Sequence, residues 1–369
     1  MSFLNRLIPA VAGSLMLAAT LALPATASTL GDAAAQMQPG DWRVLNQAGD
    51  GAGFEFSLLV SCAADCGDNI LNYTDKGMWN PLTREIQFIG KGHLRELKHI
   101  SYSEANNRWS QEAQPNWDCG RAVPCWSIGH GYEHSTINPA NGDIYQRLFN
   151  SPEVYKWTRA TKTWSRLPVA PNLEVAIALQ YFPEMGGLVM VGGGQVAFYR
   201  ESTGTWSSLA TGLAMGGYHT VASYSPIHKI VVLGGGNGST SLYRLSANGT
   251  VSSIANAPIG VGISQSIFTV DPVSGKFLLF GSSREFFEYN PTTNGWSSVA
   301  SSSVPMFRGG SNAILYRAAV PISTHGVIAF LAEGGSADSR VFLYRHTTGP
   351  SAPPMDTTPP IVPTGLVVN

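Results

Sequence analysis

A short pattern recurs along this chain: an aromatic residue is followed seven positions later by tryptophan. It occurs at four places: Tyr102 to Trp109, Trp157 to Trp164, Tyr199 to Trp206, and Tyr289 to Trp296. The last two copies read "YRESTGTW" and "YNPTTNGW", so the likeness extends to the residues between the aromatics. Such self-similarity indicates either a duplicated structural unit or a recurring ligand site, and the two lead to different functions.

A second mark accompanies the first, a proline turn followed by an apolar run. Six copies are present, 43 to 58 residues apart, and their prolines are Pro81, Pro139, Pro183, Pro226, Pro272 and Pro321. Proline fixes φ and glycine tolerates positive φ, so each turn reverses the chain. The run that follows, as in "KIVVLGGG", is rich in β-branched residues and too short for a globular helix.

These marks divide each copy into four strands. A β-rich run such as "HTVASY" comes before the proline turn, the apolar run follows it, a third strand carries the tyrosine and a fourth the tryptophan. Four antiparallel strands in about 45 residues form one propeller blade. The sequence therefore predicts an all-β propeller of six four-stranded blades. One sheet cannot bury both of its faces alone, so we expect the paired aromatics to be core residues that pack against the next blade. We do not expect them to form a repeated sugar-binding surface.

The repeats resemble those of a known family. The Y-x6-W strand, the "GGG" that ends an apolar strand and the "GYHTVASY" before it are similar to kelch repeats, and they resemble the galactose oxidase and kelch type of propeller. The resemblance spans residues 41–349 and is weakest in the first and last blades, where the glycines are lost or displaced. It implies a fold and not an activity.

The two ends of the repeat region complete each other. The sixth copy reaches Tyr344 in "VFLYRHTTG" without a tryptophan partner, whereas Trp42 stands alone in "GDWRVLNQ". We expect the segment around Trp42 to be an N-terminal strand that closes the last blade, since ring closure removes exposed sheet edges. A seventh blade built from "GFEFSLLVS" is an alternative, although that segment lacks both marks.

The chain begins with features of an exported protein. Residues 1–27 hold one positive charge, an apolar run and a closing "ATA", which predicts a signal peptide; an uncleaved membrane anchor is the alternative. No later segment has the ~20 continuous apolar residues that span a bilayer, so we expect no membrane span in the mature chain. Residues 28–349 form the predicted propeller. Residues 350–369 are a proline-rich linker whose end, "TTPPIVPTGLVV", resembles the start of a truncated fibronectin type III module.

Export determines how the four cysteines are interpreted. In an oxidising compartment two disulfides are expected from Cys62, Cys66, Cys119 and Cys125, and three pairings are possible. Pairing of Cys62 with Cys66 and of Cys119 with Cys125 is favoured because each pair brackets one short loop; a zinc site is the alternative. The copper-radical chemistry of galactose oxidase needs a cysteine-linked tyrosine. Because these cysteines are expected in disulfides, we predict no metal and no cofactor.

Charge and motifs exclude other classes of function. The formal net charge is −1, only 13% of residues are charged, and no basic stripe runs through the sequence, so nucleic acid is not an expected partner. The sequence contains no G-x-S-x-G nucleophile elbow, no H-E-x-x-H motif and no phosphate-binding loop.

Chemistry is expected in the loops that lead into the innermost strands, on what we term the top face. Two such loops, before the first and second blades, are long and carry a cysteine pair each. Aromatic rings suit the apolar faces of sugars, and arginine suits a carboxylate or sulfate. The candidate ligand-binding residues are Trp117, Arg121, Trp126, Tyr218 and His219. The candidate catalytic residues are His130, Tyr132 and His134, because histidine and tyrosine can act as base and acid in a polysaccharide lyase.

Structural roles are alternatives for the histidines. His134 and His219 each begin an innermost strand, where kelch repeats often carry a histidine for packing. If His130 and His134 occupy one extended strand, they stand ~13 Å apart and cannot chelate one ion. Further candidates near the same loops are Lys98, His99 and Arg147.

Three classes of function follow from these observations. The first is a secreted kelch-type propeller that binds an extracellular glycan or surface polymer through its top-face loops. The second is a polysaccharide-active, lyase-like enzyme that uses the loop of His130 and Tyr132. The third is a protein-interaction scaffold with a surface protein as partner. In each case we expect a secreted monomer, extracellular or periplasmic, and the sequence does not decide whether the chain is an enzyme.

Overall fold

The computed structural model describes residues 29–46, 55–60, 69–92, 97–113, 130–171, 174–300, 317–332 and 339–347. The predicted signal peptide and the proline-rich tail with its fibronectin-like start lie outside these residues. So do seven residues singled out in the two long loops, which are Cys62, Cys66, Trp117, Cys119, Arg121, Cys125 and Trp126.

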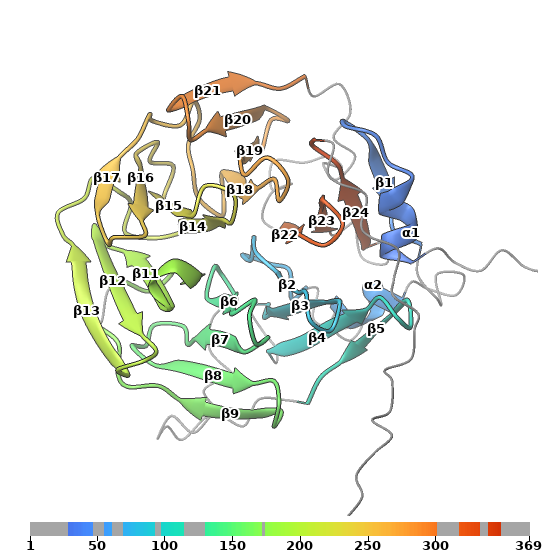
Figure 1. Ribbon diagram of the computed structural model, residues 1–369, viewed down its shortest axis with the longest axis horizontal. Coiled ribbons are helices and arrows are strands. Elements are labelled where there is room, and N and C mark those ends of the chain that lie inside the picture. Colours follow the sequence, from blue (N-terminus) through green and yellow to red (C-terminus); the bar gives the residue numbers. More distant parts are fainter. Residues whose placement is uncertain are drawn as a thin grey trace, which may run out of the picture.

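Six antiparallel sheets of four strands each form a ring in the described part of the chain (Figure 1). Blade 1 comprises β2 (Met78–Asn80), β3 (Glu85–Gly90), β4 (Lys98–Ser103) and β5 (Arg108–Gln111). Blade 2 comprises β6 (Ser135–Ile137), β7 (Ile144–Arg147), β8 (Val154–Thr158) and β9 (Thr163–Arg166). Blade 3 comprises β10 (Ala178–Phe182), β11 (Gly187–Gly192), β12 (Gln195–Arg200) and β13 (Thr205–Ala210).

The second half of the ring repeats this order. Blade 4 comprises β14 (Thr220–Ser225), β15 (Ile230–Gly235), β16 (Leu242–Ser246) and β17 (Val251–Ser253). Blade 5 comprises β18 (Ser266–Val270), β19 (Phe277–Gly281), β20 (Phe286–Asn290) and β21 (Gly295–Ser298). Blade 6 comprises β22 (Arg317–Ile322), β23 (Val327–Ala332), β24 (Arg340–Tyr344) and, as its outer strand, β1 (Trp42–Val44). The predicted six-bladed, kelch-like propeller is confirmed.

The first strand of blades 1 to 5 and β22 of blade 6 surround the central channel (Figure 1). These inner strands run in one direction, as the parallel bridges between Lys76 and Ala319 and between Glu133 and Ala178 show. The channel therefore has an N-terminal mouth, where the inner strands begin, and a C-terminal mouth, where they end. The N-terminal mouth is the predicted top face. The repeated prolines lie at the other end, and one of them starts a short 3-10 helix, η2 (Pro183–Met185).

Ring closure by the N-terminal strand is confirmed. Trp42 pairs with Tyr344 across β1 and β24, and the two rings stack with centroids 4.5 Å apart. The Trp42 ring also lies 5.3 Å from the Phe330 ring and meets the edge of the Phe280 ring at 6.2 Å. Closure thus joins the start of the described chain to its end, and β1 covers the edge that β24 would otherwise expose.

The repeated aromatics are cross-strand pairs between the third and fourth strands of a blade. The partners are Tyr102 and Trp109, Trp157 and Trp164, Tyr199 and Trp206, and Tyr289 and Trp296. In blade 4, Tyr243 pairs instead with Ser253, and Val251 pairs with Leu245. We expected each aromatic pair to pack against the next blade along the chain, and this prediction is wrong. Trp206 Nε1 donates to the Pro168 carbonyl after blade 2, and Trp296 Nε1 donates to the Ala255 carbonyl after blade 4, so each tryptophan faces the preceding blade.

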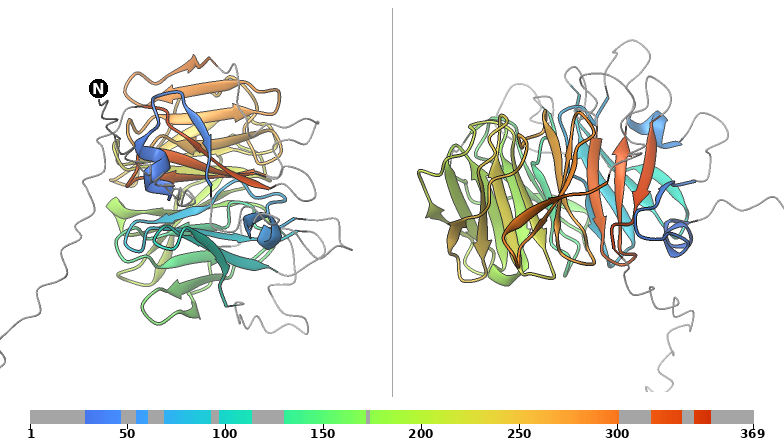
Figure 2. Two further views of the ribbon diagram at one scale, coloured as in Figure 1. Left: turned by 90° about the vertical axis from the view of Figure 1, so that its right-hand side faces the viewer. Right: turned by 90° about the horizontal axis from the view of Figure 1, so that it is seen from above.

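Two short helices lie at the outer side of the ring, beside blades 1 and 6 (Figure 2). The segment proposed for a seventh blade forms α2 (Glu55–Val60), whose Phe56 packs 4.8 Å from the Trp109 ring. The helix α1 (Leu30–Ala35) begins with a capping box at Thr29. No helix among the described residues is long and apolar enough to cross a membrane.

A buried polar cluster links blade 1, blade 6 and α1 beside the closing strand. Arg84 donates two hydrogen bonds to the Glu104 carboxylate, at 3.0 and 2.9 Å, and His325 Nε2 lies 3.0 Å from the same group. The backbone N–H of Gly31 in α1 also donates to Glu104. Burial raises the pKa of Glu104, but the hydrogen bonds and charges of His325 and Arg84 outweigh it and lower that pKa to about 2.

Candidate functional site

Aromatic and imidazole rings from three segments meet at the N-terminal mouth. We name this group the mouth cluster and define it as Tyr73, His130, Tyr132, Tyr218 and His219. The ring of Tyr73 lies 4.6 Å from His130 and 5.9 Å from His219, and the ring of Tyr132 lies 5.4 Å from His130 and 5.7 Å from His219. The loops before blades 1, 2 and 4 supply these residues, so the channel geometry assembles the cluster.

Three members of the mouth cluster adopt a left-handed backbone. The φ angles are +51° at Tyr73, +45° at Tyr132 and +61° at His219. This region is uncommon for side chains other than Gly, Asn and Asp, and strained residues gather at functional sites. The bend at Tyr132 also means that His130 and His134 do not lie on one extended strand, so the ~13 Å separation considered above does not apply.

Local packing holds these bends in place. The Tyr132 N–H donates to the Tyr73 carbonyl at 2.9 Å, and the His219 N–H donates to the Ala176 carbonyl at 2.7 Å. Beside Tyr132, a Cβ on Gly131 would lie 2.5 Å from the Thr74 hydroxyl and 3.0 Å from the Ile89 carbonyl. Glycine at position 131 therefore lets the loop before blade 2 approach blade 1 closely.

Burial sets the protonation of the cluster. His130 and Tyr132 are 9% and 8% exposed, whereas the Tyr218 side chain is 41% exposed and His219 is half-buried. Burial, together with the nearby Tyr73 and Tyr218, raises the pKa of Tyr132 to about 12. Burial also lowers the pKa of His219. At neutral pH the mouth therefore offers a neutral imidazole and a protonated phenol, which can accept and donate a proton respectively.

His134 and Arg147 lie beneath the cluster. His134 is fully buried, its ring is 5.2 Å from Tyr132, and its Nε2 lies 3.3 Å from Arg147 Nη1. Arg147 donates to the carbonyls of Glu174 and Val175 at 2.6 and 2.8 Å. Burial first, and then the charge of Arg147, holds the pKa of His134 well below its usual value. Both residues support the cluster from below, and neither reaches the surface.

A buried ion pair crosses the channel below the mouth cluster. Lys76 Nζ lies 3.1 Å from Glu133 Oε2 and also donates to the carbonyls of Leu179 and Ala222, at 2.7 and 3.3 Å. The same carboxylate oxygen of Glu133 accepts from the Ala222 N–H at 2.8 Å. Lys76 therefore joins blades 1, 2, 3 and 4 across the channel.

The structure brings together some of the predicted site residues and not others. His130, Tyr132, Tyr218 and His219 meet at the N-terminal mouth, whereas Lys98 and His99 lie on β4, the third strand of blade 1. His99 is buried, contacts Gln87 at 2.7 Å and packs against the Trp157 ring, so its role is structural. In the described ranges, no three His, Cys, Asp or Glu side chains gather in a way that could hold a metal ion.

Sequence reasoning missed Tyr73, Lys76 and Glu133. Tyr73 stands in "LNYTDKG", at the end of the first long loop, and Glu133 stands between two predicted site residues. Their positions immediately before inner strands were the available signal. The loop with Trp117, Arg121 and Trp126 lies outside the described residues.

Comparison with known proteins adds little to this geometry. No protein-family model matches the chain, and no curated protein matches it in sequence. Among solved structures, it is similar to a novel fungal alcohol oxidase with catalytic diversity among the AA5 family, in complex with copper. The similarity has a TM-score of 0.45 and 10% sequence identity, and it covers 74% of this chain and 75% of the oxidase. At that level it supports no inference about activity, and the fold of this chain rests on its own strand order.

Proposed function

We propose that this chain is a secreted propeller that binds an extracellular glycan at its N-terminal mouth. The observation that carries the proposal is the convergence of Tyr73, Tyr132 and His219, all in left-handed conformations, beside the exposed ring of Tyr218. Aromatic rings present large, rigid apolar surfaces with polar edges, which suit a sugar ring. The strained backbone holds these rings in place before a ligand arrives, which lowers the entropic cost of binding.

We propose that residues of the long loop before blade 2 also contribute to glycan binding. This loop returns to the described chain at His130, within the mouth cluster. Trp117, Trp126 and Arg121 on that loop are proposed to add two further aromatic faces and a cation for an acidic sugar. Disulfides between Cys62 and Cys66 and between Cys119 and Cys125 are proposed to hold the two long loops.

A protein-docking face receives less support. The exposed large apolar side chains in the described residues are scattered over separate elements: Val44, Leu58, Leu82, Val169, Tyr218 and Ile227. Single exposed apolar residues are normal on soluble proteins, whereas docking sites present contiguous apolar patches.

A polysaccharide panel tests glycan binding. The purified mature chain is applied to immobilised neutral and acidic polysaccharides, and the Tyr218→Ala variant is compared with Ile227→Ala. Ile227 is 54% exposed in the turn after β14, at the opposite end of the channel, so it is a matched control for loss of an exposed apolar side chain. We expect Tyr218→Ala to weaken binding by about tenfold, equivalent to ~1.4 kcal/mol, and the control to leave it unchanged. Equal losses in both variants, or no bound polymer, would contradict the proposal.

A lyase-like activity is the second candidate, favoured by the contact of His130 with Tyr132. An eliminating enzyme needs a base to remove a proton and an acid to protonate the leaving oxygen. The raised pKa keeps Tyr132 protonated at neutral pH, so its hydroxyl is available as the acid, and a neutral imidazole in the cluster is available as the base; His134, buried below, is assigned a positioning role. The assay is ultraviolet absorbance of unsaturated products. We expect Tyr132→Phe to lower kcat by about 100-fold or more while polymer binding persists. A flat trace on every polymer would remove this candidate.

A further inference from the structure

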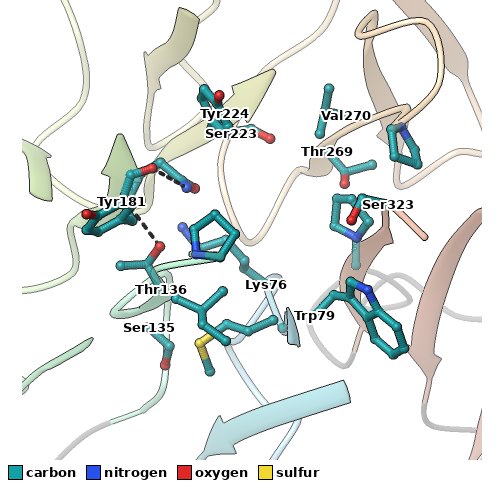
Figure 3. Close-up of a pocket in the computed structure, with 18 of the residues that line it drawn as sticks. Lys76, Trp79, Ser135, Thr136, Tyr181, Ser223, Tyr224, Thr269, Val270 and Ser323 are labelled. Atoms are coloured by element: carbon teal, nitrogen blue, oxygen red, sulfur yellow. Dashed lines mark hydrogen bonds between the residues drawn. The ribbon is translucent and has the colours of Figure 1, made fainter. Parts of the chain in front are cut away.

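A cavity of about 190 Å³ opens at the C-terminal mouth, on the far side of Lys76 from the mouth cluster (Figure 3). Five of the six repeated prolines line it: Pro81, Pro139, Pro226, Pro272 and Pro321. A protein cavity of ~150 Å³ is large enough to take benzene. This cavity therefore has room for one ring with a short substituent.

The cavity walls are mostly apolar. Trp79, Phe268 and Val270 line it, and Figure 3 shows Trp79 and Val270 on separate blades around the cavity. The hydroxyl-bearing side chains of Thr269 and Ser323 also lie along the wall. Apolar walls with a few polar groups are typical of small-molecule sites.

One carboxyl group that lines the cavity has no donor from another residue. Asp75 is 1% exposed, and among the described residues no other residue donates a hydrogen bond to its carboxylate oxygens. The neighbouring Lys76 directs its hydrogen bonds to Glu133, Leu179 and Ala222. An ionised Asp75 therefore has no hydrogen-bonded cation of its own.

Burial of a carboxylate without a cation disfavours its ionised form and so raises its pKa. Burial, followed by the nearby Glu133 carboxylate, raises the pKa of Asp75 well above its usual value, and the attraction of Lys76 is smaller. A ligand that brings a positive donor would restore the missing partner, because hydrogen bonds to charged groups are stronger than neutral ones. An anionic ligand offers no such partner, so Asp75 would stay protonated beside it.

We propose that the C-terminal cavity binds a small organic cation, in which a primary ammonium group meets Asp75 and an apolar ring or short chain packs against Trp79 and Phe268. This site is separate from the proposed glycan site, because no residue of the mouth cluster lines the cavity. Its occupancy does not depend on the function of the N-terminal mouth.

Benzylamine and benzyl alcohol are the probes that test this site. They have the same shape, but only benzylamine is charged at neutral pH. Binding to the mature chain is measured by isothermal titration calorimetry. We expect benzylamine to bind at least about tenfold more tightly than benzyl alcohol. Ionisation of Asp75 on binding should release a proton to the buffer, so the heat should vary with the buffer's ionisation enthalpy.

Three variants locate the effect. Asp75→Asn should abolish the preference for benzylamine and the proton release, and it should fold about as stably as the parent because a neutral amide replaces a buried carboxyl that is already uncharged in the empty site. Glu174→Gln removes a negative charge at the N-terminal mouth and should change neither probe. Ser323→Trp adds a ring at an exposed position of the rim and should weaken both probes. Equal affinity for the two probes, no binding of benzylamine, or an unchanged preference in a folded Asp75→Asn variant would overturn the proposal.

Discussion

Replacement of Trp42 by alanine tests how the ring is held closed. The Trp42 side chain is half-buried and contacts the rings of Tyr344, Phe330 and Phe280. A buried aromatic covers ~150 Å² or more, which at ~25 cal/mol per Å² corresponds to about 4 kcal/mol as an upper estimate. Partial exposure and residual burial in the unfolded chain reduce this figure. We therefore expect Trp42→Ala to lower the free energy of unfolding by about 3 kcal/mol.

The matched control is Trp296→Ala in blade 5. Trp296 occupies the equivalent position, pairs with Tyr289 at a ring distance of 5.3 Å, and is also half-buried, so its loss should cost a similar free energy. The two variants differ in the connection of the strand, because β21 follows its neighbour β20 through a tight turn whereas β1 joins β24 only by pairing. If β1 detaches in Trp42→Ala, the whole edge of β24 becomes exposed. In Trp296→Ala we expect β21 to stay paired with β20.

Chemical denaturation and amide hydrogen exchange provide the assay. The free energy of unfolding should fall by a similar amount in both variants, whereas exchange in β1 and β24 should accelerate only in Trp42→Ala. The backbone bonds from Gly40 N–H to the Arg345 carbonyl and from Leu45 N–H to the Val341 carbonyl are the reporters. A loss below about 1 kcal/mol for Trp42→Ala, or unchanged exchange in β24, would refute closure by this tryptophan.

Three further predictions concern packing and charge. The pKa of Glu104 is lowered to about 2 in the folded protein, so the ionised carboxylate stabilises the fold above the usual pKa of 4.5. This stabilisation is lost as the pH falls from 4.5 toward about 2. Glu104→Gln should therefore remove that part of the pH dependence of thermal unfolding. A Cβ on Gly187 would lie 1.8 Å from a neighbouring backbone oxygen, whereas a Cβ on Gly212, at φ +71°, would meet open space. Gly212→Ala should lower the free energy of unfolding by about 1 kcal/mol, from backbone strain alone. Gly187→Ala should lower the denaturation midpoint more than Gly212→Ala does. Lys76→Met should lower the free energy of unfolding by about 3–5 kcal/mol, since it leaves the buried Glu133 carboxylate without its cation.

The fold could be predicted because its signals repeat. The prolines recur every 43 to 58 residues, and the aromatic pairs recur with them. Trp42 and Tyr344 each lacked a partner within their own segment, which predicted that they pair with each other. The exceptions lie where the repeat is interrupted. The segment that forms α2 carries neither mark, and in blade 4, which has no fourth-strand tryptophan, Tyr243 pairs with Ser253.

The candidate site could be predicted only in part. His130, Tyr132 and His219 were identified by residue type and by their place before inner strands. Lys76 and Glu133 are 57 residues apart and meet only because the ring brings neighbouring inner strands side by side, which no local pattern encodes. The left-handed conformation of Tyr132 was not predicted either, since no sequence signal marks a tyrosine that tertiary contacts force into that region.

A crystal structure of the mature chain with a bound oligosaccharide from the polysaccharide panel would locate the proposed glycan site. We expect the sugar to lie over Tyr218 and His219 at the N-terminal mouth, with at least one ring face in contact with an aromatic side chain. A sugar bound at the proline-lined C-terminal mouth or on the outer rim of the blades would contradict the proposed site.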